Sequence, residues 1–550
     1  MTAEFQRGGA LARLADEHFD VLVVGGGITG AGVALDAASR GLRTALVERH
    51  DFASGTSSKS SKLVHGGLRY LQQREFRLVY DALRERQIAL RNAPHLVRVL
   101  PFLIPVMTRD GLIDRRIARA LGTAMWMYDL TGGARIGKVH RRIDKRRALE
   151  HMPSLAPDRL ASAYLYYDAQ ADDARLTLTI VRTAAVEHGA AAVNYAPVTT
   201  LLKDANGRAR GARVATGDGA EIEVRADAVV NAAGVWADDV RALDEGAHPH
   251  SIRPAKGVHL TVPWTKVRND IAAIVPVPKD RRSIFVVPWG DLTYIGTTDT
   301  DYDGPLDDPV CTPEDVRYLL DAMNASLAEP LRESDVVGTW AGLRPLLAAA
   351  ASERTADLSR RHAVARSASG MVTVTGGKLT TYRAMAADAV DDVVEDLGRG
   401  GRSRTKRLPL LGGRGYERPP SAAEPSRHEH LAGRYGTLAD DVRALVEQDP
   451  SLGERLVPGL PYLRAEAVYA ARMEMARTVD DVLSRRTRAR LLARDASARA
   501  AEDVGAILAA ELGWSDDERA AQVDAYRRSV ASEREAADLP ETALDSSVGA

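Results

Sequence analysis

The sequence predicts an α/β protein in which a parallel-sheet domain is joined by an antiparallel β domain and a helical C-terminal domain. Three observations predict this division. Residues 21–48 are typical of strand, glycine turn, helix and second strand, residues 253–298 are rich in short β-runs, and residues 431–537 are rich in Ala, Leu, Arg and Glu at helical spacing. At 550 residues the chain is too long for one core, so we expect two or three domains.

The glycine turn after the first strand is the most informative stretch. Gly25, Gly27 and Gly30 form the pattern G-x-G-x-x-G. The first glycine permits a tight turn, the second lets the backbone approach a pyrophosphate, and the third lets the helix pack on the strand. Glu48 ends the second strand, where its carboxylate can accept both ribose hydroxyls and repel a 2′-phosphate. The motif therefore predicts a site for FAD or NAD rather than NADP, with a purely structural glycine turn as the alternative.

Two later segments are predicted to return to the same domain. In Ala228–Ala237 a β-run ends in Asn-Ala-Ala-Gly, which includes Ala233 and Gly234. In Met371–Arg383 a β-run is followed by a Gly-Gly turn and a helix that begins at about Thr380. We therefore expect a discontinuous domain whose chain leaves and returns twice.

The segments between these pieces have a different character. The short runs Val258–Val262, Ile284–Val287 and Leu292–Ile295 predict a mostly antiparallel sheet that caps the substrate. Before them, Pro101–Asp129 is apolar with a weak helical period.

Charge and cysteine content narrow the location and the partners. Lys and Arg number 74 against 75 for Asp and Glu, so no general basic field attracts nucleic acid. The single Cys311 excludes an internal disulfide framework and suits a reducing cytoplasm. Neither a signal peptide nor a bilayer-spanning window is apparent, so membrane contact is expected to be peripheral. Arg135–Arg147 carries seven Lys or Arg and one acid, which predicts either a solvated face or a patch for anionic lipid.

Residues 54–71, SGTSSKSSKLVHGGLRYL, form the second informative stretch. Six of the eight residues from Ser54 to Ser61 carry a hydroxyl. The polar side chains that follow are those of Lys62, His65, Arg69 and Tyr70. Hydroxyls and cations at this density satisfy phosphate and ribitol oxygens, so we predict a binding role. A flexible Ser-rich loop is the alternative.

Seven motifs occur along the chain in the order GGGITGAG, TSSKSSKLVHGGLRYL, AAGVWAD, KGVHL, IGTTD, AGLRPL and GGKLTTYR. As a set they resemble the FAD-dependent, quinone-linked glycerol-3-phosphate dehydrogenases, from about Asp20 to Arg383. The resemblance implies a Rossmann-like FAD-binding domain of the glucose-oxidase type, an antiparallel β substrate domain and a helical C-terminal domain. The reaction it implies converts glycerol 3-phosphate to dihydroxyacetone phosphate, with hydride transfer from C2 to FAD and electrons passed to a membrane quinone.

The motifs, together with the composition of the C-terminal third, lead us to expect the following domain limits and cofactor contacts. The limits are 18–100, 181–245 and 356–400 for the FAD-binding domain, 101–180 and 246–355 for the substrate domain, 401–430 for a linker, 431–537 for the helical domain and 538–550 for a disordered tail. By resemblance, the Ser-rich stretch and GGKLTTYR border the isoalloxazine ring. The predicted cofactor-binding residues are Gly25, Gly27, Gly30, Glu48, Thr56, Ser57, Ser58, Ser61, Lys62, Ala233, Gly234, Gly377, Lys378, Leu379 and Thr380.

The predicted substrate site needs fixed cations for a phosphate dianion. Arg344 can bond the phosphate or a hydroxyl oxygen bidentately, and Lys378 can hold the flavin or the substrate. Arg69 and Tyr70 add a cation and a hydroxyl. The sequence departs from the family where an acidic loop is expected, because Ala348–Ser359 is alanine-rich. Arg360, or Arg361 after it, would supply the phosphate contact that follows that loop.

Oxidation of the alcohol also requires a base for the C2 hydroxyl proton. The resemblance places His259 at the substrate, so His259 is the preferred base, and His65 is the runner-up that can instead serve the flavin. A packed core histidine is the alternative reading of His259.

Other functions are less well supported by the sequence. A glycerol-3-phosphate oxidase that reduces O2 to hydrogen peroxide would have the same site. A catalytically silent flavoprotein and an NAD-dependent dehydrogenase are two further alternatives. Metal ligands at ligand spacing and a G-x-S-x-G nucleophile are not apparent in the sequence. We expect a cytoplasmic protein that can attach peripherally to the inner face of the cell membrane. The sequence does not decide between a monomer and a homodimer.

Overall fold

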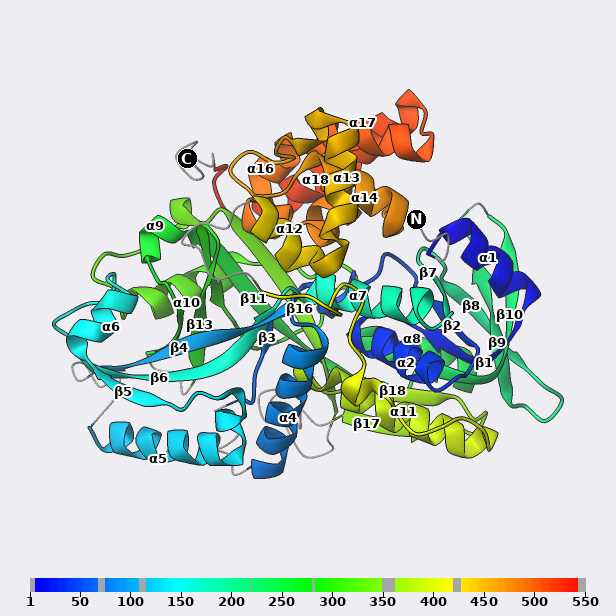
Figure 1. Cartoon of the computed structure of the whole chain (residues 1–550), viewed down its shortest axis with the longest axis horizontal. Helices are drawn as coiled ribbons and strands as arrows, with labels where there is room; N and C mark the ends of the chain where they lie inside the picture. Colours follow the sequence, from blue (N-terminus) through cyan, green and yellow to red (C-terminus); the bar gives the residue numbers. More distant parts are fainter. Residues whose placement is uncertain are drawn as a thin grey trace.

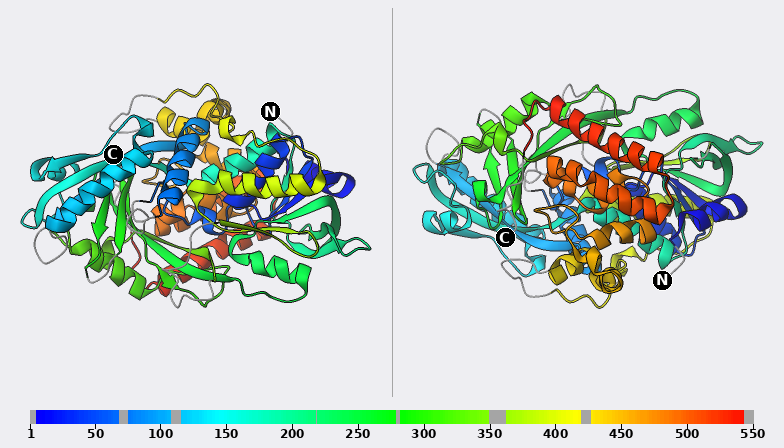
Figure 2. Two further views of the ribbon diagram at one scale, coloured as in Figure 1. Left: turned by 90° about the horizontal axis from the view of Figure 1, so that it is seen from below. Right: turned by 90° about the horizontal axis from the view of Figure 1, so that it is seen from above.

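A computed structural model describes residues 5–67, 75–107, 115–217, 219–278, 282–348, 362–418 and 427–542. Within these residues the chain builds two β-sheets, and helices from its C-terminal third lie across both (Figures 1 and 2). The predicted fold class is confirmed, because the two sheets are separate and the C-terminal region is helical.

The first sheet has eight strands, six of them in the order β17-β18-β10-β1-β2-β7. Its strands are β1 (His18–Val24), β2 (Thr44–Val47), β7 (Ala191–Val193), β8 (Val198–Lys203), β9 (Ala209–Ala215), β10 (Glu221–Asn231), β17 (His362–Arg366) and β18 (Val372–Gly376). β1 is parallel to both β2 and β10, and β10 is parallel to β18. The sheet thus takes its strands from three separate stretches of the chain.

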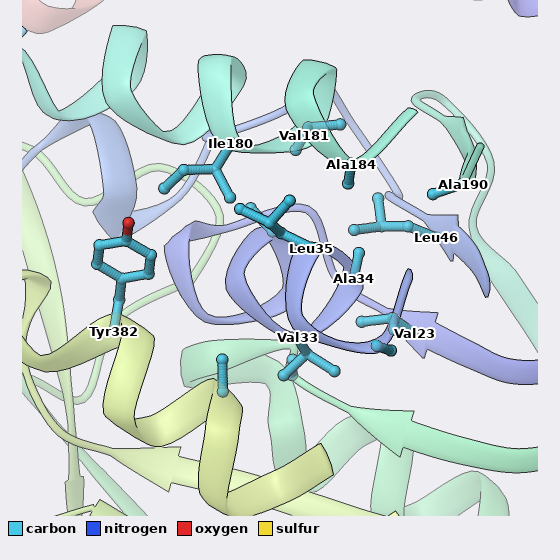
Figure 3. Packing of buried hydrophobic residues seen from close by; sticks show 14 of the residues in the cluster. Val23, Val33, Ala34, Leu35, Leu46, Ile180, Val181, Ala184, Ala190 and Tyr382 are labelled. Carbon is cyan, nitrogen blue, oxygen red and sulfur yellow. The ribbon is translucent and has the colours of Figure 1, made fainter. Parts of the chain in front are cut away.

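Helices cover both faces of this sheet because its central strand is apolar on both sides. Val21 and Val23 pack towards α2, while Leu22 and Val24 belong to the core on the α1 face. The helices are α1 (Arg7–Asp16), α2 (Ile28–Ser39), α7 (Asp173–Val186), α8 (Ala237–Glu245) and α11 (Tyr382–Leu397). α2 lies between α7 and α11, and its valines and alanines fill the space around it (Figure 3). A Cβ on Gly32 would lie 3.0 Å from the Tyr382 ring, so α11 approaches α2 closely there.

The second sheet has ten strands, eight of them in the order β15-β11-β14-β13-β12-β4-β6-β3. Its strands are β3 (Leu63–Val64), β4 (Val97–Met107), β5 (Arg141–Asp144), β6 (Leu160–Ala171), β11 (Ile252–Pro263), β12 (Ala272–Pro276), β13 (Ser283–Trp289), β14 (Leu292–Gly296), β15 (Thr300–Asp301) and β16 (Gly338–Leu347). All its recorded pairings are antiparallel except that between β12 and β4. The helices that accompany it are α4 (Phe76–Asn92), α5 (Arg115–Thr131), α6 (Lys145–His151), α9 (Trp264–Val267) and α10 (Pro313–Asn324).

The helical region comprises seven α-helices and one π-helix among the described residues. They are α12 (Arg427–Tyr435), α13 (Ala439–Gln448), α14 (Arg464–Met473), the π-helix η10 (Asp481–Arg486), α15 (Ala489–Leu492), α16 (Arg494–Arg499), α17 (Ala501–Leu512) and α18 (Asp516–Ala536). The region has its own apolar core. Buried ion pairs join the helical region to the domain that contains the first sheet. Both Arg485 and Arg486 bond Asp51 of that domain.

The structure differs from the sequence analysis in three segments. The helical period read over 101–129 is wrong for its first part, because Pro101–Met107 belong to β4 and are held by an extended antiparallel pairing with β6. The limit expected between residues 180 and 181 falls inside α7, which packs on α2 as one helix. The segment expected to be a linker, 401–430, contacts the first sheet's domain near its start, because the Thr405 hydroxyl donates a hydrogen bond to Asp36 of α2.

The end of the described chain is also ordered, although we expected a disordered tail from residue 538. Leu539 is buried, and both the backbone N–H and the hydroxyl of Thr542 donate to Asp495. Residues 543–550 lie outside the described residues.

Candidate active site

The glycine turn links the end of β1 to the start of α2. Gly25 has φ +109°, and a Cβ there would lie 2.7 Å from the Ala232 carbonyl oxygen. A Cβ on Gly30 would lie only 1.8 Å from the Gly25 carbonyl oxygen. Gly27 caps α2, so the positive end of the helix dipole faces the turn. A side chain at Gly25 or Gly30 would therefore collide with the backbone at the turn, so the close approach of β1, α2 and β10 requires glycine at both positions.

Glu48 lies at the end of β2, next to this turn. Its two carboxylate oxygens accept hydrogen bonds from the backbone N–H groups of Gly26, at 2.6 Å, and His50, at 2.8 Å. Burial raises the pKa of Glu48 above its ordinary value. The carboxylate is held in one orientation at the cavity wall, which suits an acceptor for ribose hydroxyls.

A cavity of about 330 Å³ opens beside the turn and collects most of the predicted cofactor-binding residues. Those that line it are Gly25, Gly27, Glu48, Thr56, Ser57, Ala233, Gly234, Gly377, Lys378 and Leu379. Gly30 lies beneath the turn instead, where its role is the close contact with Gly25. The glycine turn at the start of α2 and the Glu48 carboxylate in the same cavity fit a dinucleotide.

The second Gly-Gly turn brings the returning chain to the same cavity. Gly377 has φ +80°, and a Cβ there would lie 2.4 Å from the Met385 sulfur. Thr380 follows in the short helix η6 (Leu379–Thr381), and its hydroxyl accepts a hydrogen bond from the His65 N–H at 3.1 Å. His65 is half-buried, and its ring meets that of Phe285 edge to face at 5.9 Å. GGKLTTYR and the His65 segment are therefore adjacent in space.

The hydroxyls of the Ser-rich stretch are used mainly to hold the stretch itself. The Ser57 hydroxyl accepts from the Ile28 N–H at 2.8 Å, and the Thr56 hydroxyl donates to the Leu343 carbonyl at 2.5 Å. The Ser58 hydroxyl donates to the Gly55 carbonyl at 3.3 Å. Ser58, Ser61, Lys62 and Thr380 are not among the residues that line the 330 Å³ cavity. Their predicted cofactor contacts stay predictions.

His259 lies on β11 in an aromatic cluster and is only 2% exposed. Its ring stacks on Trp340 at 4.6 Å between ring centroids, with 9° between the planes. Its Nε2 forms a 2.9 Å hydrogen bond with the Ser61 hydroxyl. Burial lowers the pKa of His259 well below 6.5, and the charges of Lys62 and Arg344 lower this pKa further. The ring is therefore neutral at physiological pH.

Arg344 lies on β16 beside the same part of β11. Its guanidinium bonds the Asp299 carboxylate at 3.0 Å and the Thr298 carbonyl at 3.2 Å, and the side chain is 24% exposed. A Cβ on Gly257 would lie 2.5 Å from this guanidinium. Since residues two apart in a strand share a face, Gly257 leaves room for Arg344 on the face that carries His259. The structure thus brings the predicted base and the predicted phosphate ligand together.

Three predicted substrate contacts, Arg69, Tyr70 and Arg360, lie outside the described residues. Sequence reasoning also missed residues that shape the site. Trp340 stacks on His259, and its place four residues before Arg344 in TWAGLRPL was an available signal. Asp173 and Arg488 hold the Ser-rich stretch, but neither belongs to a recognisable motif.

Comparisons with known proteins agree with this geometry. Residues 20–383 match the model of FAD dependent oxidoreductases, and residues 403–519 match the C-terminal domain of alpha-glycerophosphate oxidase. Glycerol-3-phosphate dehydrogenase 2 of Mycobacterium tuberculosis is 44% identical over 522 residues, which cover 93% of this chain and 88% of that protein. The mitochondrial glycerol-3-phosphate dehydrogenase of Homo sapiens is 39% identical over 542 residues, covering 93% and 73%.

A solved structure shares nearly the whole fold. The glycerol-3-phosphate dehydrogenase from Bacillus halodurans complexed with FAD is 30% identical, covers 98% of this chain and 99% of its own, and has a TM-score of 0.75. Fold and cavity together define an FAD-dependent oxidoreductase, with FAD as its cofactor. The similarity spans both the oxidoreductase domain and the C-terminal domain. The chain belongs to the family of FAD-dependent glycerol-3-phosphate dehydrogenases.

Proposed function

We propose that this flavoenzyme oxidises glycerol 3-phosphate to dihydroxyacetone phosphate and passes the electrons to a membrane quinone. The observation that carries the substrate assignment is the placement of Arg344 and His259 on the paired strands β16 and β11, with the Arg344 guanidinium against Gly257, two residues before His259. The names of the relatives at 39–44% identity support the same substrate.

The side chains divide the work of this reaction. Bound FAD supplies a hydride acceptor at N5. Arg344, held by Asp299, is oriented to bind a phosphate or hydroxyl oxygen through its planar fork. Neutral His259 can accept the C2 hydroxyl proton, and its hydrogen bond to Ser61 fixes the ring orientation. Lys378 lines the cavity and would supply a cation to the flavin or the substrate.

Anaerobic addition of glycerol 3-phosphate to the purified yellow protein tests the assignment. The flavin absorbance should bleach. Arg344→Ala should abolish bleaching while FAD stays bound, and loss of FAD as well would mean that Arg344 is structural. A protein that holds FAD but is bleached by an amino acid and not by glycerol 3-phosphate would refute the substrate assignment.

Quinone is the proposed electron acceptor, and oxygen is the competing one. The resemblance to quinone-linked enzymes favours quinone, whereas the C-terminal family model takes its name from an oxidase. Turnover with a soluble quinone analogue under nitrogen, with little peroxide in air, is the expected result. Hydrogen peroxide formed in step with substrate consumption would instead identify an oxidase.

We also propose that the protein is cytoplasmic and docks on the inner face of the cell membrane through α4 and α5. None of the helices in the described ranges is long and apolar enough to cross a bilayer. On α5, Trp126 is 59% exposed and Leu130 is 82% exposed, and on α4 Phe76 and Tyr80 are exposed. The two helices α4 and α5 contact each other (Figure 2, left). The basic run 135–147 begins four residues after α5 ends. Apolar side chains beside lysines and arginines suit an anionic lipid surface.

Sedimentation with vesicles that contain anionic lipid tests this docking face. The variants W126S/L130S and R146Q/R147Q should each shift the protein to the supernatant. The matched control R527Q/R528Q removes two exposed arginines from α18 in the helical region and should sediment like the wild type. Equal sedimentation of all variants would exclude α5 and the basic run as the contact.

A further inference from the structure

The helical C-terminal region reaches into the first domain through Arg488, whose side chain is fully buried. Its guanidinium donates to the Ser58 carbonyl and, at 3.1 Å, to the Asp173 carboxylate. A third bond, 3.0 Å long, runs to the Ser484 carbonyl of the helical region itself. One side chain therefore ties the helical region to the Ser-rich stretch.

Asp173, the first residue of α7, holds the same stretch from the other side. Its Oδ2 accepts hydrogen bonds from the Ser60 N–H at 2.9 Å and the Ser60 hydroxyl at 2.7 Å. Lys62 completes this contact through Nζ, which donates to Oδ2 at 3.4 Å and to the Ser58 carbonyl at 3.3 Å. Asp173 is buried, so its charge requires both Arg488 and Lys62 as partners.

The substrate domain engages two further carbonyls of this stretch. The Trp340 indole donates to the Ser60 carbonyl at 3.2 Å, and the Tyr294 hydroxyl donates to the Ser61 carbonyl at 2.9 Å. The Ser61 hydroxyl then meets His259. The backbone from Ser58 to Ser61 is thus fixed by groups from three parts of the molecule.

We propose that Arg488 and Asp173 are positioning residues for the reaction, because together they fix the Ser58–Ser61 backbone and thereby the Ser61 hydroxyl that orients His259. This inference rests on the proposed function, in which His259 accepts the substrate proton. The C-terminal region then contributes to the rate of the chemical step, although none of its described residues, 427–542, is among those that line the cofactor cavity. A displacement of about 1 Å at a reacting group can lower a rate about 100-fold.

Anaerobic stopped-flow reduction of the bound FAD by saturating glycerol 3-phosphate tests the inference. Arg488→Met should lower the reduction rate constant about 10- to 100-fold while the full amplitude is kept. Arg488→Lys keeps the charge and should restore part of the rate. A merely structural role would lower the amplitude, as a fraction of the molecules is lost, and leave the rate constant of the remaining molecules unchanged.

Arg494→Met is the matched control. Arg494 is an equally buried arginine of the same region, but it bonds Asp495 and the Pro540 carbonyl, not the Ser-rich stretch. The FAD bound to the Arg494→Met variant should be reduced at the wild-type rate. If Arg488→Met does not fold, Asp173→Asn and Ser60→Ala carry the test, and each should slow reduction at full amplitude.

Failure of the positioning role and failure of the proposed function would give different results. Wild-type rates in the FAD-loaded Arg488, Asp173 and Ser60 variants, or equal slowing by Arg494→Met, would refute the positioning role alone. A wild-type protein whose FAD is not reduced by glycerol 3-phosphate would refute the proposed function, and the inference with it.

Discussion

At the scale of single residues, the surroundings of His259 hold its imidazole neutral. Burial and the nearby cations Lys62 and Arg344 all act against the protonated form. A neutral imidazole can accept a proton, but a low pKa makes it a weak base. Its contribution to the rate must therefore come from its fixed position rather than from its basicity.

The pH dependence of FAD reduction at saturating substrate follows from this environment. The base form is lost as pH falls through the pKa of His259, which lies well below 6.5. The rate constant should therefore be constant from about pH 6.5 upward and fall only in more acid solution. His259→Asn should lower the plateau about 100- to 10,000-fold and remove the acid inflection.

His65→Asn is the comparison for this measurement. It should keep both the inflection and most of the rate. An inflection that disappears in His65→Asn and persists in His259→Asn would identify His65 as the base.

At the scale of elements, the turn between β1 and α2 depends on the absence of one side chain. A methyl group at position 30 would lie 1.8 Å from the Gly25 carbonyl oxygen, so either the turn or α2 must move. Gly30→Ala should release FAD and destabilise the protein by about 1–3 kcal/mol, as overpacking does elsewhere. Thermal unfolding and the FAD content of the purified protein measure both effects.

Gly8→Ala is the matched control for Gly30→Ala. Gly8 is in α1, and a Cβ there would meet nothing within 4 Å. The substitution should leave FAD bound and raise stability by about 0.4–1 kcal/mol, because alanine loses less conformational freedom on folding. Equal loss of FAD in both variants would mean that the contact at Gly25 is not the cause.

The elements also show why sequence reasoning succeeded in one place and failed in another. Gly25 and Gly30 could be predicted because the geometry of one short turn requires them. The strand β4 could not, because its conformation is stabilised by β6, about sixty residues further on. Arg488 could not either, since its partners Ser58 and Asp173 are more than 300 residues away and follow no spacing rule.

At the scale of the whole molecule, some buried ion pairs join the helical region to α7, and others lie within the helical region itself. Glu474 bonds Arg175 and Arg182 of α7. Within the helical region, Glu466 accepts hydrogen bonds from the Tyr435 hydroxyl and the Leu463 N–H, and it pairs with His430 and Arg434. These cationic and hydrogen-bonding partners lower the pKa of Glu466 to about 2, against the penalty of burial.

Acid should therefore destabilise the helical region. The ordinary pKa of glutamate is 4.5, so the stabilisation by Glu466 is complete above that pH and is lost as pH falls towards 2. The loss is on the order of 3 kcal/mol for a shift of this size. Glu466→Gln should flatten the pH dependence of unfolding between pH 4.5 and 2, measured by urea denaturation. An unchanged slope in the variant would assign the acid sensitivity to other carboxylates.

The three-part origin of the first sheet has a consequence for biosynthesis. β18 and the Gly-Gly turn that closes the cofactor cavity lie near residue 377, more than 350 residues after β1 begins. At about 5–20 residues per second, the ribosome needs roughly 20–75 s to reach this turn. Until then the emerging chain exposes β1 and β10 without their full set of neighbours. We therefore expect flavin loading to be a late step in the maturation of this enzyme, because the cavity is complete only after this turn has been made.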